Sequence, residues 1–139
     1  MKSITLNSDT ILQMKLFRDI TNISCGDCFS IERTVIFVTK KGDTAKAIGS
    51  GGKNIKILRS KLNKNIKVIE ESHDCCSLVK NFIFPLKVKE CNQVEDKIEV
   101  EFNHSRERRF LLDNQQRGLK ELKAAVSRYY PDIKDIRIL

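Results

Sequence analysis

The sequence predicts an α+β fold, an α/β sandwich in which one α-β-β-α-α-β unit occurs twice in tandem. Each unit is expected to contain a three-stranded mixed sheet covered by helices, over residues 1–72 and 73–139. One observation is that the same order of helical and β-type patterns is found in both halves of the 139-residue chain. A second is that an apolar frame recurs 64 positions later, in register. The frame consists of Ile48, Ile55, Leu58 and Leu62 in one half and Leu112, Leu119, Leu122 and Val126 in the other.

In the first unit, apolar residues at helical spacing predict a helix over residues 11–20, with an N-cap among residues 7–9. Residues 23–32 are expected to be extended and to form a hairpin with a buried, β-branched strand over residues 33–38. Asp43 or Thr44 is expected to cap a short helix over residues 45–48. A longer helix then runs to about Leu62, and a closing strand covers residues 66–69.

The second unit follows the same order. A helix is expected over residues 74–84, an extended segment over 87–93 and a strand over 97–102. Two helical stretches, near residues 106–112 and 117–128, precede a last strand over 133–139.

A glycine-rich loop, Gly49-Ser50-Gly51-Gly52, lies between the two later helices of the first unit. Glycines permit positive φ and leave no Cβ between the backbone and an approaching ligand. The helix that follows places free N–H groups and the positive end of its dipole beside the loop, and Lys53 adds a full charge. This arrangement predicts a loop that a phosphate group approaches closely.

The spacing of the glycines distinguishes three kinds of phosphate loop. A Walker A loop would need glycine at Ala47 and a hydroxyl at Asn54, and a dinucleotide-binding loop would need its third glycine at Asn54. Residues 48–55 instead fit I-G-x-x-G-x-x-I, the signature of a KH domain, whose turn clamps about four nucleotides of single-stranded nucleic acid. The α-β-β-α-α-β order is that of a type II KH domain. An ordinary glycine-rich turn that binds nothing is the remaining alternative.

Basic residues gather around this loop. The chain has 26 Lys and Arg against 18 Asp and Glu, and Asp43 is the only acid between residues 39 and 67. A cluster of one sign favours contact with phosphate groups over mere solubility. The expected RNA-binding residues are Lys46, Ile48, Gly49, Ser50, Gly51, Gly52, Lys53, Asn54, Lys56 and Arg59.

The repeat places Asp113-Asn114-Gln115-Gln116 where the first unit has its glycine loop. Without glycines, side chains would crowd an approaching phosphate, so the second unit is expected to clamp poorly. A secondary basic surface with Arg109, Arg117 and Lys120 is still expected to attract a nucleic-acid backbone by charge.

The cysteines offer one C-x-x-C pair, Cys25 and Cys28, which together with His73, Cys75, Cys76, Cys91 and His104 leaves zinc binding open. Because a zinc ribbon usually shows two such pairs, we expect structural cysteines and neither metal nor cofactor.

No nucleophile with a positioned base is evident, so we expect no catalytic residue and no enzyme activity. No apolar run approaches the ~20 residues of a membrane helix, so we expect a cytoplasmic protein, a monomer, with no membrane partner.

Besides the two α-β-β-α-α-β units, the sequence has the I-G-S-G-G-K-N-I stretch, the Asp27-Cys28 pair and an Asn81-Phe82-x-x-Pro85 junction. With these features it resembles the short archaeal form of the transcription factor NusA. The resemblance implies a pair of KH domains that binds nascent single-stranded RNA and affects transcription termination or antitermination. RNA polymerase or the elongation complex is the further partner it implies. A KH-domain protein of the ribosome or of ribosome assembly, bound to ribosomal RNA, is the alternative.

Overall fold

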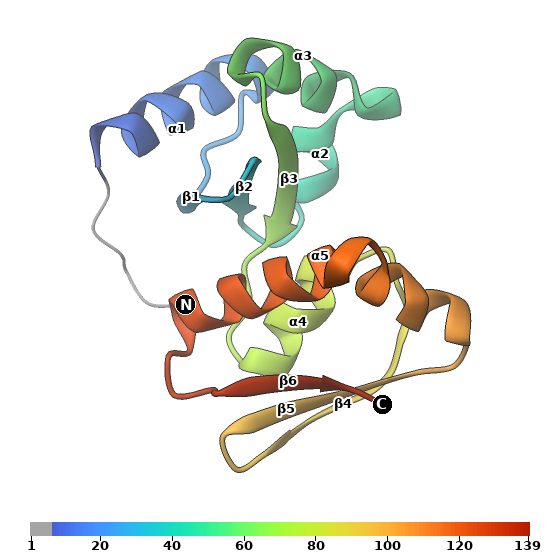
Figure 1. The fold of residues 1–139 in the computed structure, drawn as a ribbon. Coiled ribbons are helices and arrows are strands. Elements are labelled where there is room, and N and C mark those ends of the chain that lie inside the picture. The colour runs from blue at the N-terminus through green and yellow to red at the C-terminus, as the bar shows by residue number, and fades with distance from the viewer. Residues whose placement is uncertain (1–6) are drawn as a thin grey trace. The chain divides into compact units, whose positions relative to one another are not determined.

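The computed structural model describes residues 7–139 and divides the chain into two compact units, one ending at Glu71 and one beginning at Ser72 (Figure 1). Each unit has a three-stranded mixed sheet with helices on it. The predicted α+β class and the twofold α-β-β-α-α-β order are therefore confirmed. None of the helices within residues 7–139 is long and apolar enough to cross a lipid bilayer.

The first unit is built around its central strand. Its elements are α1 (Ser8–Thr21), β1 (Asp27–Ile31), β2 (Thr34–Thr39), α2 (Thr44–Ile48), the 3-10 turn η1 (Ser50–Gly52), α3 (Lys53–Leu62) and β3 (Asn65–Glu70). Strand β2 pairs antiparallel with β1, which confirms the predicted hairpin, and parallel with β3. Every residue of β2 is buried, as its apolar sequence predicts.

The ends of α1 follow the capping signals. The Oδ1 atom of Asn7 accepts a hydrogen bond from the Thr10 amide at 2.8 Å, and Asn22 ends the helix in the left-handed conformation. The predicted side-chain cap of α2 is wrong. Asp43 holds the N-cap position but makes no capping hydrogen bond, because its backbone is helical (φ −94°, ψ −15°) and not extended. The Thr44 hydroxyl instead lies 2.7 Å from that of Thr39.

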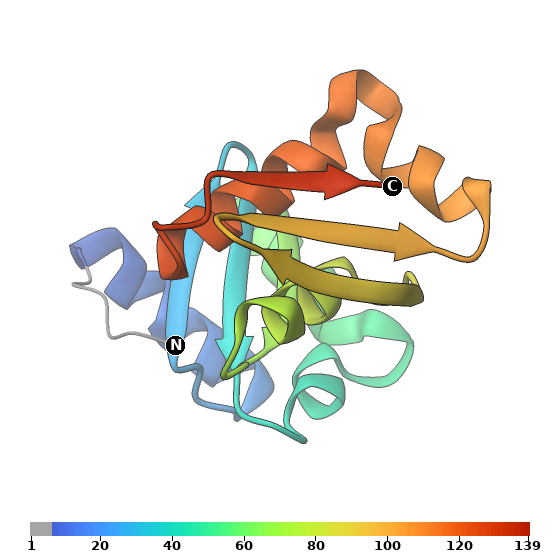
Figure 2. The same ribbon diagram turned by 90° about the horizontal axis from the view of Figure 1, so that it is seen from below.

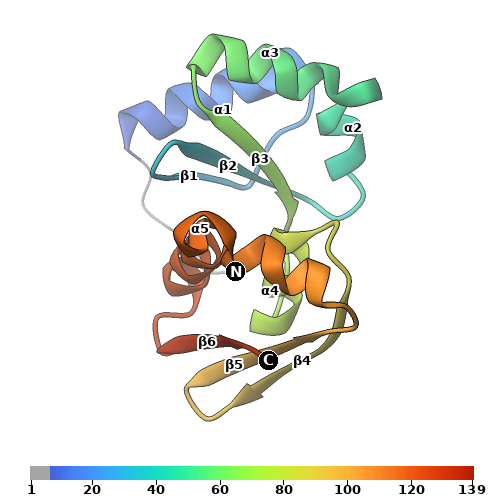
Figure 3. The ribbon, with the colours of Figure 1, turned by 45° about the vertical axis from the view of Figure 1, so that its right-hand side comes forward.

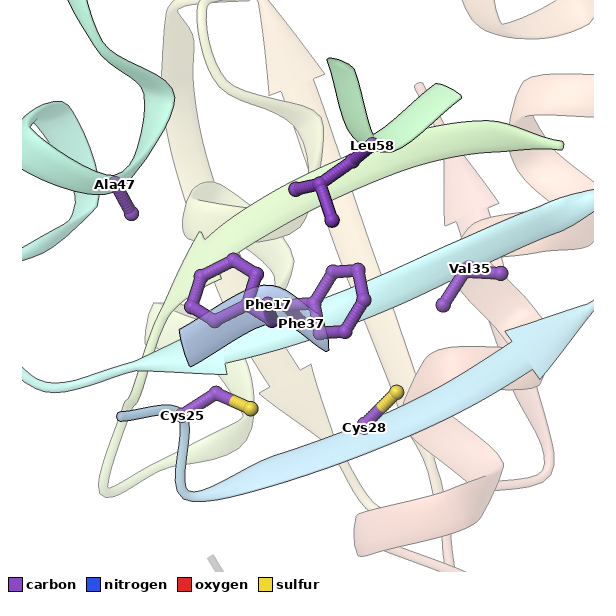
Figure 4. Packing of buried hydrophobic residues seen from close by; sticks show 7 residues of the cluster. All are labelled: Phe17, Cys25, Cys28, Val35, Phe37, Ala47 and Leu58. Carbon is purple, nitrogen blue, oxygen red and sulfur yellow. The ribbon is translucent and has the colours of Figure 1, made fainter. Parts of the chain in front are cut away.

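A buried cluster attaches the helices to the sheet of the first unit (Figure 4). Helices α1 and α3 lie side by side on this sheet (Figures 1 and 3). Phe17 of α1 stacks on Phe37 of β2 with ring centroids 4.5 Å apart. Ala47 of α2 and Leu58 of α3 are fully buried in the same cluster, so both helices that flank the glycine loop are anchored.

The second unit repeats this plan. Its elements are α4 (Cys75–Ile83), β4 (Val88–Val94), β5 (Lys97–Phe102), α5 (Ser105–Tyr129) and β6 (Asp135–Ile138). Strand β5 is central, antiparallel to β4 and parallel to β6. Helix α5 changes direction at residues 113–116, whose backbone is not helical, so it consists of the two helical stretches that the sequence predicts (Figure 2).

Candidate nucleic-acid interface

The glycine loop has the backbone that only glycine adopts freely. Gly49 (φ 80°, ψ 167°), Gly51 (φ 61°, ψ 19°) and Gly52 (φ 73°, ψ 23°) all have positive φ, as predicted. A Cβ atom at Gly51 or Gly52 would meet no heavy atom within 4 Å. Backbone conformation, and not lack of space, therefore favours glycine at these two positions, and the space beside them is open to a ligand.

The loop leads directly into an uncapped helix. The amides of Gly52 and Lys53 close the turn by donating to the carbonyl oxygens of Gly49 and Ser50. Helix α3 then starts without a side-chain cap and without an acidic residue in its first turn. The Lys53 amide is thus already used within the turn, whereas an N–H group of a first turn that lacks such a partner is oriented to bind an anion.

Asn54 holds the two helices together below the loop. It is 8% exposed, and its Nδ2 atom donates to the Ala47 carbonyl oxygen at 3.0 Å. A Cβ atom at Gly49 would lie 2.9 Å from that Nδ2 atom. Gly49 is therefore required both by its φ and by lack of space. The structure places Asn54 inside the protein, whereas the sequence analysis groups it with residues that contact RNA.

The predicted cations of the first unit lie at the surface. Lys46 of α2 and Lys53, Lys56 and Arg59 of α3 are exposed, as is Ser50, whereas Ile48 is half-buried. Within residues 7–139, none of these four cations forms an ion pair. Their charges therefore remain available to an anionic partner.

The last two residues of the second loop adopt the left-handed backbone of Gly51 and Gly52 without any glycine, whereas its first two residues differ from Gly49 and Ser50 in φ. Gln115 (φ 60°, ψ 35°) and Gln116 (φ 63°, ψ 32°) match Gly51 and Gly52, and Asp113 has the same ψ of 167° as Gly49 although its φ is −71°. Asn114 is also left-handed, at φ 54°. Sequence reasoning missed this geometry because glutamine carries no signal for positive φ, and only the 64-residue register points to it.

A compensating exchange explains how the second loop keeps this shape. Gly118 stands where the first unit has Asn54, and a Cβ atom there would lie 3.2 Å from the Cα of buried Leu111. The first unit thus has glycine in the loop and a side chain in the helix, whereas the second has Asp113 in the loop and glycine in the helix. Leu111 and Leu122 take the buried positions of Ala47 and Leu58.

The secondary basic surface is partly neutralised. Arg109, Arg117 and Lys120 are all exposed. The Nε atom of Arg117 lies 3.2 Å from the Oε1 atom of Glu121, so this guanidinium already forms an ion pair with a carboxylate. The charge available to phosphate groups is therefore smaller than beside the first loop.

The cysteines of the C-x-x-C pair are buried. Cys25 and Cys28 lie in the apolar cluster of the first unit, and burial raises the pKa of the Cys25 thiol to about 11. His73 and His104 are exposed. No group of three or more His, Cys, Asp or Glu side chains within residues 7–139 could hold a metal ion.

Comparison with known proteins finds relatives that share one name. Proteins named "Probable transcription termination protein NusA" are 36% identical in Methanococcus vannielii, over 63% of this chain and 50% of that protein, and 32% identical in Methanocaldococcus jannaschii, over 63% and 48%. The chain thus spans about half the length of these two curated relatives. A protein of the same name from Thermoplasma acidophilum is 26% identical over 94% of this chain and 92% of its own.

The crystal structure of APE1850 superposes with a TM-score of 0.81 at 23% identity, covering 96% of this chain and 100% of that one, which shows the fold. The family model described as "KH domain" matches residues 12–103, well over half of the sequence. With the glycine turn between α2 and α3, these findings establish that the chain belongs to the KH-domain family and resembles the archaeal NusA proteins.

Proposed function

We propose that this chain binds single-stranded RNA and that the loop of residues 49–52 clamps the RNA backbone. The single observation that carries the proposal is the combination of an open glycine turn with the uncapped N-terminus of α3 and four exposed cations that form no ion pair with any residue from 7 to 139. A KH domain uses such a turn to hold about four nucleotides.

In this proposal, the RNA phosphates approach the backbone at Gly51 and Gly52, where no side chain stands in the way. Ser50 and the cations Lys46, Lys53, Lys56 and Arg59 contact the adjoining phosphates. Gly49, Ile48 and Asn54 act indirectly, because they set the angle between α2 and α3 and with it the direction of the loop.

We further propose that the chain acts on nascent RNA in transcription termination or antitermination, as a cytoplasmic monomer that meets RNA polymerase or the elongation complex. The name shared by its relatives supports this role. Crosslinking RNA to the protein in cells and sequencing it tests the role. Enrichment of nascent transcripts, with recovery of RNA polymerase, supports it. Enrichment of ribosomal RNA, with recovery of ribosomal subunits after a salt wash, contradicts the transcriptional role and supports a function in the ribosome or its assembly.

The clamp itself is tested with the double variant Ser50→Asp/Gly51→Asp, which sets two carboxylates against the incoming phosphates. Both positions are exposed, so the apolar frame is untouched. We expect RNA affinity to collapse while the fold survives. In the parent chain, affinity should fall with salt at a slope of about 0.7 per neutralised phosphate, and the variant should show a smaller slope.

The matched control is Ser8→Asp/Asn103→Asp, which changes the net charge by the same amount at two exposed positions outside the loop. We expect this control to weaken binding only slightly. If the control loses as much affinity as the loop variant, binding depends on overall charge and not on a clamp. If the loop variant binds RNA as tightly as the parent chain, the loop of residues 49–52 is not the clamp.

A further inference from the structure

We propose that the second unit presents a base-contacting surface, formed by Phe110 together with the amide side chains of Asn114, Gln115 and Gln116. This surface would contact unpaired bases by stacking and by hydrogen bonds, whereas the first unit holds the phosphate backbone. The inference rests on the proposed function, because it names a further part of the RNA that the chain contacts.

The second loop keeps its shape at a cost. Three successive L-residues, Asn114, Gln115 and Gln116, have positive φ, a conformation that is unfavourable for residues with a Cβ atom. All three are exposed, and Gln115 and Gln116 project their amides from the left-handed backbone that Gly51 and Gly52 form in the first unit. An amide side chain has both a donor and an acceptor, which is what the edge of a base requires.

Phe110 lies three residues before this loop, on the first helical stretch of α5, and is 70% exposed. In the 64-residue register it stands where the first unit has Lys46. A single exposed apolar residue is ordinary on a protein surface. Phe110, however, lies close in sequence to the exposed cations Arg106 and Arg109, which complement the charge of a nucleic acid. An aromatic ring among cations is the combination on which unpaired bases stack.

The same observations argue against a second phosphate clamp. Asp113 places a carboxylate at the first loop position, and Arg117 is already paired with Glu121. The amide contacts depend on the identity of the base, and the stacking contact depends hardly on salt, so both differ measurably from a phosphate contribution. This difference provides the test.

The experiment measures the affinity of the full chain for short homopolymeric oligoribonucleotides of each base by fluorescence anisotropy, over a range of salt concentrations. Phe110→Ala is compared with Phe84→Ala, a matched control because Phe84 is also highly exposed, at 78%, and lies outside the surface. We expect Phe110→Ala to lower affinity by about five- to 150-fold for the preferred base, with an unchanged salt slope. Phe84→Ala should bind like the parent.

A second variant, Gln115→Gly/Gln116→Gly, removes two amides while keeping a backbone that glycine adopts freely. We expect it to reduce the difference in affinity between homopolymers. If both variants bind every homopolymer as the parent does, the surface does not contact RNA and the inference is wrong, while a clamp in the first unit still stands. If the parent chain binds none of the oligonucleotides, the proposed function fails first.

Discussion

The positive φ angles in the second loop lead to a prediction about stability. Replacing Gln115 and Gln116 with glycine should stabilise the protein, although glycine within a helix normally destabilises it. A left-handed L-residue costs about 1–2 kcal/mol, and glycine loses about 0.5–1 kcal/mol through its greater freedom in the unfolded chain. Both side chains are exposed, so few contacts are lost. With the middle of each range, the net gain is about 0.75 kcal/mol for each substitution.

Urea and thermal unfolding of the full chain measure this gain. For a chain of this size, 1 kcal/mol shifts the midpoint by roughly 4 °C, so the double variant should melt about 4–8 °C higher. Ala124→Gly is the control, because Ala124 is an exposed residue within the second helical stretch of α5. Glycine there should destabilise by about 1 kcal/mol. If the two glutamine variants lose as much stability as this control, residues 113–116 are ordinary helix and the correspondence between the loops is refuted.

Three further substitutions test the framework. Asn54→Ala should destabilise by about 1–3 kcal/mol, since it leaves the buried Ala47 carbonyl without its donor, and urea unfolding measures this loss. Cys28→Ser should lower stability modestly and leave RNA affinity per folded molecule unchanged; zinc retained at stoichiometry after dialysis of the parent would contradict that structural role. Asp74→Ala should cost about 1 kcal/mol at neutral pH, because Asp74 caps α4 through the Ser77 amide. That hydrogen bond lowers the pKa of Asp74, so the cap stabilises the fold above the ordinary pKa of 3.8, and this stabilisation is lost as the pH falls below that value. The unfolding midpoints of the parent and of Asp74→Ala should therefore converge in acid.

The sequence alone predicts the order of elements and the first loop. Amphipathic spacing, β-branched runs and the N-cap signal among residues 7–9 act over a few residues, so they can be interpreted without knowing what packs on them. The glycine spacing works in the same way, because positive φ at Gly49, Gly51 and Gly52 is a local property of glycine. The 64-residue register also follows from apolar positions alone, and it correctly indicates where the second loop lies.

Only the tertiary structure decides what supports each loop. Asn54 follows a lysine in a basic segment and is predicted to face RNA, but packing of α3 against α2 turns it inward to the Ala47 carbonyl. The helical backbone at Asp43 likewise prevents the predicted cap. The left-handed run in the second loop depends on helices anchored by Leu111 and Leu122, with Gly118 leaving room between them. Local preference disfavours such a run at Gln115 and Gln116, and it persists because the buried contacts of the two flanking helices outweigh that preference.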